Sequence, residues 1–564
     1  MAGGMISGRP ACERIWLFLR RHESDDLLRA SMNSPRSGPV ARIALLLGLS
    51  FAAFYAGTSR GVFVFGDDIL MYQVTAAIWE RGEVAVASVA PRKDVAHASR
   101  GVGSRRFAKY GLAPSLVALP FYGASHRLFD RLELPETADT FGNLRTGPTI
   151  FGTGLANAVT GGATVAVTFL LAVELGFPLL VALATAICLG ATTLLAHYAS
   201  TFLSEPLSAL CLAVVLLGLL KAKGKGKGSV KEVAAGRWWL AASGFAAGLM
   251  VATKVAHIVV VLPFFCWVAV LGWRRSRHRG LVVHTLYWSL FFCTWLGAIA
   301  AYNWSRFGSV FETGYGREAG NFTTPLALGL AGLLASPAKG VIWYCPVLFL
   351  SLLGARAFWR RDRACALAIL AASALWLVLI SRYYQWFGGG SWGPRFLVPL
   401  LPLWILPAAE TLDRWRRGRG WSATIVLLVA ASLVVSMAPL LVPFSDLEAP
   451  LTWSRTHFAR AGWRLQDSPL LQALELVPRA AATTTAKLLG SGVLGEAGRP
   501  REGPRFPDFA FEHYGSHALL EWTRGSFLLA TLALALAIGL AIRASSSKAA
   551  AGTAEARRTR SGAG

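Results

Sequence analysis

The strongest constraint on the fold of this chain is a series of long apolar runs that recurs through most of the sequence. Crossing the hydrocarbon core of a bilayer takes about 20 apolar residues in an α-helix. A helix also satisfies its own backbone hydrogen bonds in lipid. The sequence therefore predicts an all-α polytopic membrane protein with about 12 transmembrane helices. The predicted spans are 40–58, 148–174, 177–197, 206–220, 238–254, 257–273, 281–301, 340–356, 364–381, 395–411, 421–443 and 525–543.

The distribution of charge decides the predicted topology. The net charge is +25, but the basic residues cluster in short loops between apolar runs, such as 221–237 and 274–279. Short loops rich in Lys and Arg stay in the cytoplasm, so the predicted partner is the membrane and not nucleic acid. The pattern holds if the N-terminus is cytoplasmic and the apolar stretch 111–129 lies on the outer surface. We therefore expect a multi-pass protein of the inner (plasma) membrane with both termini in the cytoplasm.

This topology leaves long segments outside the cytoplasm. We expect the segment 444–524 to pack on the membrane domain as short helices, because it has too few apolar residues for a large core of its own. The seven cysteines lie mostly inside apolar runs and show neither a disulfide framework nor zinc-ligand spacing. The predicted domains are a cytoplasmic basic arm 1–39, a transmembrane domain 40–443 with an outer catalytic loop 59–147 that carries surface helices, the outer segment 444–524, a last transmembrane helix 525–543 and a cytoplasmic basic tail 544–564.

Two adjacent carboxylates, Asp67 and Asp68, stand just beyond the first apolar run. An acid so close to a span is costly unless it has a partner or a function. One interpretation is that either aspartate caps the amphipathic helix that follows, in which Leu70 and Val74 share the apolar face. The other, which we favour, is a general base held at the membrane surface.

Several spans that enter from the outside begin with a small residue and proline, which favour a helix start. Lys339 and Arg395 add positive charge at two of these starts, where helix N-termini bind phosphate readily. The alternative is that both side chains only reach to the interface. For Arg395 we favour function, because aromatic residues that suit a sugar, or else an interfacial belt, crowd the loop before it, among them Tyr384 and Trp392. The starts are at 147–148, 204–206, 336–339 and 393–395.

Other polar residues near the outer face have plainer interpretations. Glu205 is either an acid of a first helical turn or a second acid of the site, and both remain open. Lys254 and His257 lie between two spans, and we favour a satisfied structural role for them. The stretch 302–318 is expected to be a hydrogen-bonded structural loop.

These segments together resemble the GT-C superfamily of lipid-linked-sugar glycosyltransferases, in particular its bacterial branch near the protein O-mannosyltransferases and aminoarabinose transferases. In that superfamily an acid follows the first span, in an outer loop with surface helices, which is the place of GDDILMY here. The usual acid pair of that branch is Asp-Glu, so the pair Asp67-Asp68 leaves open which residue is the base. The resemblance covers about residues 40–440, and its further segments are KYGL at 109–112, FLSEPLS at 202–208, RFGSVFETGYG at 306–316, SPAKGVIWYCP at 336–346 and GGSWGPRFLVPLLP at 389–402.

The resemblance implies transfer of a sugar from a polyprenyl-phosphate donor to a lipid, glycan or protein acceptor outside the cytoplasm, with inversion and an Asp general base. No cofactor is certain, and a divalent metal is left open. The alternatives are a lipid-carrier transporter or flippase, and a glycan polymerase or ligase with a lipid-linked donor. The candidate site consists of the catalytic residues Asp67 and Asp68 and the substrate-binding residues Tyr72, Lys109, Tyr110, Glu205, Lys339, Tyr384, Trp392 and Arg395.

The topology can be tested by labelling cysteines in a background that lacks the native ones. A cysteine in place of Thr140, in the outer loop, should react with an impermeant thiol reagent in intact cells. A cysteine in place of Ser229, in the basic loop 221–237, should react only after the cells are opened. The reverse pattern would contradict the predicted topology.

Overall fold

The structure of the protein is a computed structural model, and it describes most of the chain. The basic arm before residue 37, the glycine-lysine stretch 224–229 and much of 444–524 lie outside the described residues, as do Thr140 and Ser229. The described residues are 37–63, 66–86, 98–128, 137–138, 144–145, 147–223, 230–418, 422–443, 447, 462–492, 506–507 and 509–561.

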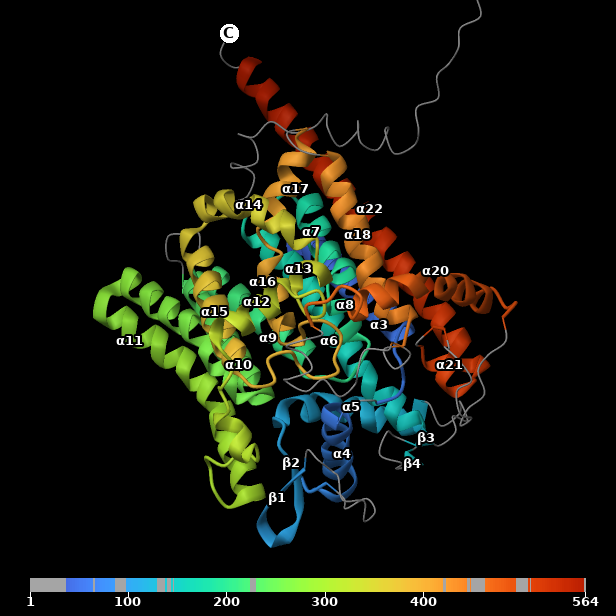
Figure 1. Cartoon of the computed structure of the whole chain (residues 1–564). Coiled ribbons are helices and arrows are strands. Elements are labelled where there is room, and N and C mark those ends of the chain that lie inside the picture. Colours follow the sequence, from blue (N-terminus) through green and yellow to red (C-terminus); the bar gives the residue numbers. More distant parts are fainter. Residues whose placement is uncertain are drawn as a thin grey trace, which may run out of the picture.

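The described residues form a bundle of long helices (Figure 1). Among the described residues, seven helices are long and apolar enough to cross a membrane, or up to eight if one bent pair counts as a span. The predicted class, an all-α multi-pass membrane protein, is therefore confirmed, whereas the predicted number of about 12 spans is not shown. The seven are α3 (Ser37–Gly57), α6 (Gly147–Glu174), α9 (Glu205–Ala222), α11 (Ile258–Phe307), α15 (Arg363–Arg382), α18 (Ser422–Leu441) and α22 (His517–Ser561).

Several predicted spans are short or broken helices. The predicted span 395–411 consists of η6 (Arg395–Leu400), α16 (Leu401–Trp404) and α17 (Ala408–Arg416), with a bend of 45°. Prolines at 399, 402 and 407 explain these breaks, because proline lacks the backbone donor that continues a helix. The other short elements in place of predicted spans are α7 (Leu179–Thr192) with α8 (Leu195–Ala199), and α13 (Val341–Tyr344) with α14 (Leu348–Arg361).

Helix α11 holds two of the predicted spans, 257–273 and 281–301. Its helical geometry fails at Ser276 and Arg277, where Arg277 has a φ of 50°. A Cβ on Gly272 would lie 2.5 Å from the carbonyl oxygen of Gly280, so the backbones on either side of the break nearly touch. The chain therefore folds back on itself there, as the two predicted spans require. Helix α10 (Val230–Thr253) packs alongside (Figure 1).

The two ends of the bundle differ. Basic residues gather with acids at one end, where Lys223 pairs with Asp362 at 2.7 Å and Arg361 pairs with Glu410 at 2.5 Å. The opposite end carries α4 (Gly66–Arg81), α5 (Leu112–Leu128) and a hairpin of β1 (Ala98–Arg100) and β2 (Arg106–Ala108), as Figure 1 shows. A second short hairpin pairs β3 (Thr137–Ala138) with β4 (Leu144–Arg145). Which end faces the cytoplasm stays a prediction.

Helix α4 is buried more completely than the amphipathic pattern predicts. Every residue from 68 to 75 is buried, including Gln73 and Thr75, so its first half has no solvent-exposed face. Its other end leaves Trp79 53% exposed. Helix α5 lies across the ends of the long helices (Figure 1), and the position of the stretch 111–129 on the outer surface stays a prediction.

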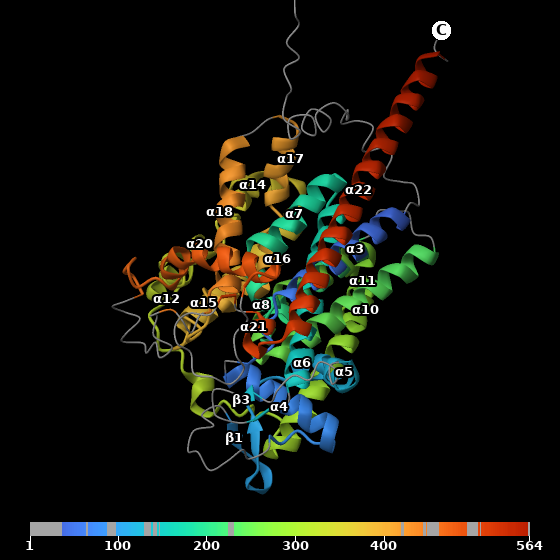
Figure 2. The same cartoon turned by 90° about the vertical axis from the view of Figure 1, so that its right-hand side faces the viewer.

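The described part of the outer segment packs on the helical bundle through α20 (Pro469–Leu488) and α21 (Ala510–Tyr514). Helix α20 lies beside α18 (Figures 1 and 2) and buries Leu470 and Ala473. Helix α21 is held near the end of α3, because the Tyr514 hydroxyl donates to the carbonyl oxygen of Gly61 at 2.7 Å. A buried ion pair between Lys487 and Glu512, at 2.7 Å, connects the two helices.

Helices α3 and α6 approach closely at two glycines. A Cβ on Gly162 would lie 2.4 Å from the carbonyl oxygen of Gly48, so the contact leaves no room for a side chain. We predict that Gly162→Leu lowers the melting temperature of the purified protein, because overpacking typically costs about 1–3 kcal/mol. The matched control is Gly297→Leu in α11, where a Cβ meets nothing within 4 Å. Equal melting temperatures for the two variants would contradict this packing.

Candidate functional site

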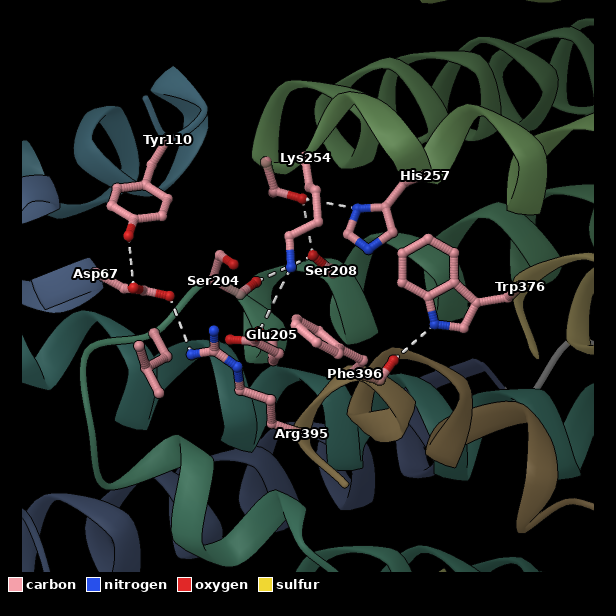
Figure 3. A network of polar contacts seen from close by, with 12 residues as sticks. Asp67, Tyr110, Ser204, Glu205, Ser208, Lys254, His257, Trp376, Arg395 and Phe396 are labelled. Carbon is pink, nitrogen blue, oxygen red and sulfur yellow. Dashed lines mark hydrogen bonds and ion pairs between the residues drawn. The ribbon is translucent and has the colours of Figure 1, made fainter. Parts of the chain in front are cut away.

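A cavity of about 450 Å³ lies where α4, the loop before α5, the α10–α11 junction, the end of α15 and the start of η6 meet. Asp67, Lys109, Tyr110 and Arg395 all line it, although more than 320 residues separate the first from the last. Four of the predicted site residues are therefore brought together. Figure 3 shows the network of polar contacts that includes Asp67, Tyr110 and Arg395.

Asp67 lies in the first turn of α4, which begins at Gly66. Its Oδ1 accepts a 2.6 Å hydrogen bond from the Tyr110 hydroxyl, and its Oδ2 lies 3.0 Å from Nη1 of Arg395 (Figure 3). Asp67 and Asp68 both lie inside the first turn of α4 and not at the cap position. The helix dipole still favours negative charge in that turn. Asp68 is buried at 2% exposure and does not line the cavity.

Arg395 opens η6 and holds Asp67 from the other side of the cavity. Its side chain is 13% exposed, and its Nε is buried with no hydrogen-bond partner among the described residues. The expected helix start is a 3₁₀ helix of only 6 residues, so the macrodipole of a long helix does not act here. Any attraction for an anion must come from the guanidinium itself, whose fork suits a phosphate.

A second ion pair follows on the far side of Arg395 (Figure 3). Nζ of Lys254, at the junction of α10 and η4 (Val255–His257), lies 3.7 Å from Oε1 of Glu205 and 4.5 Å from the ring centre of Phe396. Oε2 of Glu205 is buried and has no hydrogen-bond partner among the described residues. Lys254 lines the cavity, which the purely structural role we favoured did not anticipate. The sequence signal for this position was that Lys254 stands at the end of an apolar run.

The loop 109–111 positions two of the predicted residues. Gly111 packs so closely on α10 that a Cβ there would lie 2.1 Å from the carbonyl oxygen of Ala252. This contact holds the preceding residue, Tyr110, at the cavity. Burial and the charge of the neighbouring Asp67 raise the pKa of the Tyr110 hydroxyl. Tyr110 therefore stays a hydrogen-bond donor. Lys109 pairs with Glu318 at 2.6 Å.

The stretch 302–318, expected to be only a structural loop, contributes to the cavity wall. Tyr302, Tyr315 and Glu318 line it, and so does Tyr383 from the end of α15. The Lys109 ammonium lies 5.3 Å from the ring centre of Tyr315. These residues were missed because the local sequence does not indicate which side of a loop faces a cavity; the aromatic content of the loop was the only signal.

Five predicted substrate-binding residues do not line the cavity: Tyr72, Glu205, Lys339, Tyr384 and Trp392. Tyr72 is buried between the rings of Phe63 and Tyr122 and shares a 2.6 Å hydrogen bond with Thr149. Trp392 is 1% exposed and packs on Tyr344, and Tyr384 packs on Tyr383.

Lys339, another of these five, does not lie in a first helical turn as expected, because α13 begins only at Val341. It is buried, with its ammonium against the carbonyl oxygens of Gly389 and Ser391. Burial and the nearby Arg395 charge lower its pKa well below 10.5.

The remaining wall of the cavity is apolar. It is formed by α10, both arms of α11 and the end of α15, and Val255 and Ile258 at its edge are 46% and 47% exposed. The cavity thus combines a carboxylate, several cations and an apolar side, which suits an anion joined to a hydrocarbon chain. The apolar residues include Val251, Val255, Val259, Ile299, Leu379 and Ile380.

The described residues do not form an evident metal site. Within the described ranges, no group of three or more His, Cys, Asp or Glu side chains is placed to hold a metal ion.

Comparison with known proteins gives structural likenesses only. No protein-family model matches the sequence, and no curated protein matches it. ArnT from Cupriavidus metallidurans bound to undecaprenyl phosphate is similar, with 15% identity over 92% of this chain and 78% of that chain and a TM-score of 0.49. The Archaeoglobus fulgidus oligosaccharyltransferase in complex with Zn and sulfate is similar at 13% identity, over 70% of this chain and 53% of that one, with a TM-score of 0.44. At such scores the likenesses establish neither the family nor the activity of this chain.

Proposed function

We propose that this protein is a GT-C-type membrane glycosyltransferase that moves a sugar from a polyprenyl-phosphate carrier to an acceptor on the outer side of the inner membrane. The observation that carries the proposal is the cavity, in which the Asp67 carboxylate, the Arg395 guanidinium and an apolar wall meet. A phosphate on a hydrocarbon chain matches the cations and the wall, and a hydroxyl acceptor matches the carboxylate.

Asp67 is the general base in this proposal. Its carboxylate takes the proton of the acceptor hydroxyl while that oxygen attacks the anomeric carbon of the donor sugar. The bond between that carbon and the phosphate oxygen breaks, and polyprenyl phosphate leaves with the electron pair. Attack from the face opposite the leaving group inverts the anomeric centre. Tyr110 and Arg395 each contact one carboxylate oxygen, which fixes its direction and leaves lone pairs for the proton.

The leaving phosphate is stabilised by the cations around the cavity. Arg395 and Lys254 both line the cavity, and Nε of Arg395 is buried without a hydrogen-bond partner among the described residues. Charge that develops on the phosphate in the transition state meets donors already in place, which is the efficient form of electrostatic catalysis. The hydrocarbon chain would leave the cavity past Val255 and Ile258, whose side chains are exposed on the outside of the helical bundle.

We further propose that the chain crosses the membrane about 12 times, with both termini in the cytoplasm. The two arms of α11 count as separate passages, and the elements α7–α8, α10, α13–α14 and η6–α16–α17 supply the shorter ones. Lys221, Lys223 and Arg361 then lie on the cytoplasmic side, as the positive-inside rule favours.

Release of polyprenyl phosphate from a panel of polyprenyl-phosphate sugars by the purified protein tests the activity. We predict that Asp67→Asn lowers turnover by about 10²–10⁴-fold, the usual contribution of a general base. Asp68→Asn should lower turnover less, because Asp68 does not line the cavity. In the same assay, the mass of the unit that the acceptor gains distinguishes a transferase of single sugars from a ligase of whole glycans. Turnover by Asp67→Asn at the wild-type rate would rule out Asp67 as the base.

The role of Arg395 can be tested by changing its charge and its shape separately. Arg395→Lys keeps the charge but loses the fork, and Arg395→Gln loses both. We expect the donor kcat/KM to fall about tenfold or more in Arg395→Gln, with a smaller fall in Arg395→Lys. Since the contact strengthens as the phosphate leaves, kcat should fall as well as the apparent affinity.

A matched control is Arg361→Gln, which removes a paired arginine at the opposite end of the bundle. If folded Arg395→Gln behaves like Arg361→Gln, with the donor kinetics of the wild type, Arg395 does not contact the phosphate.

A further inference from the structure

Lys339 lies behind the loop that leads into Arg395. It sits on the turn between α12 (Leu326–Ala335) and α13 and is 1% exposed. Its Nζ donates to the carbonyl oxygen of Gly389 at 3.1 Å and also to that of Ser391. Because Lys339 does not line the cavity, it is not placed to touch a substrate there. Its contacts point instead to the backbone of the loop.

The loop 388–393 needs an external support of this kind. Gly388, Gly389 and Gly393 have φ values of 75°, 65° and 58°, which are readily adopted only by glycine. The same freedom makes a glycine loop costly to hold in one conformation. A Cβ on Gly388 would lie 2.9 Å from Cγ of Arg395, so the loop packs directly against the side chain of the arginine. A shift of the loop therefore moves the guanidinium.

The turn that carries Lys339 is itself held by the outer segment. The Ser336 hydroxyl donates to the carbonyl oxygen of Gly462 at 2.5 Å, and the Ser468 hydroxyl donates to that of Pro337 at 2.7 Å. Ser468 immediately precedes α20, which packs on α18. A continuous series of contacts thus runs from the start of α20 through Lys339 to the loop 388–393.

We propose that Lys339 is a positioning residue that holds the loop 388–393 from behind and thereby sets the Arg395 guanidinium in the cavity, with the start of α20 holding Lys339 in turn. The catalytic consequence rests on the proposed phosphate contact of Arg395. The structural part, that Lys339 fixes the loop, does not depend on any activity. The two parts can therefore be tested separately.

Hydrogen–deuterium exchange of the purified full-length protein tests the structural part. In Lys339→Met, amides in peptides that cover 388–395 should exchange about tenfold faster or more, because the loop loses its buried donor. Peptides from α5 should be unchanged. The matched control is Lys487→Met, which removes another buried lysine that donates to a backbone carbonyl, that of Phe506, away from Arg395. Wild-type exchange of 388–395 in Lys339→Met, or equal acceleration in Lys487→Met, would overturn the proposal.

Ser468→Ala is a milder variant that tests the contribution of α20. It removes one hydroxyl at the start of the series and should accelerate exchange of 388–395 by a smaller factor, about threefold, as expected for one neutral hydrogen bond. If the exchange of 388–395 does not change in Ser468→Ala but does in Lys339→Met, the α20 step is wrong and Lys339 alone supports the loop.

A double-mutant cycle on donor kinetics tests the catalytic part. Lys339→Met should lower kcat/KM about tenfold, and the double variant Lys339→Met/Arg395→Gln should be no worse than Arg395→Gln alone, because both changes remove one function. Multiplied losses would show that Lys339 acts independently of Arg395. A wild-type protein that releases no polyprenyl phosphate from any donor would overturn the proposed function, whereas the exchange experiment would still decide whether Lys339 fixes the loop.

Discussion

The ion pair between Asp67 and Arg395 is the interaction on which the arrangement of the cavity depends. The two side chains are more than 320 residues apart in the sequence and are only 23% and 13% exposed, so neither charge is well hydrated. Bringing charges out of water is costly unless their geometry is good and further hydrogen bonds satisfy them. Tyr110 supplies one such bond to Asp67. Nε of Arg395 is buried and lacks one among the described residues, so the hydrogen bonding of the pair is incomplete.

This incomplete pairing connects donor binding to the base. Under the proposed function, a phosphate that binds Arg395 would compete with Asp67 for the same guanidinium. Asp67 would keep its hydrogen bond from Tyr110 and would become more available for a proton as its pairing with Arg395 weakens. The carboxylate would thus pair most strongly with Arg395 while the cavity is empty and less strongly once the donor binds.

Sequence patterns predicted the parts of this arrangement that depend on the membrane. The apolar runs specify the class, and a charge beside a run is expensive enough to mark Asp67, Arg395 and Glu205 as special. The same reasoning could not say which charges share a cavity, because that depends on how the helices pack. Tyr315 and Glu318 were therefore assigned only to a structural loop, although they line the cavity. The broken helices were not predicted for a related reason. An apolar run that contains prolines has the same sequence pattern whether the helix continues through the prolines or bends at them.

Lys254 and Lys339 illustrate what sequence alone leaves undecided. Both are lysines beside a predicted span, Lys254 at its end and Lys339 just before its start, and both lie close to Arg395. Lys254 projects into the cavity beside a carboxylate, Glu205, which compensates its charge while leaving it accessible to a ligand. Lys339 faces the backbone carbonyls of a glycine loop, whose partial charges compensate it only while the loop keeps its conformation. Burial of the Lys339 amine is therefore favourable only while the loop 388–393 keeps its conformation. That conformation in turn sets the position of Arg395.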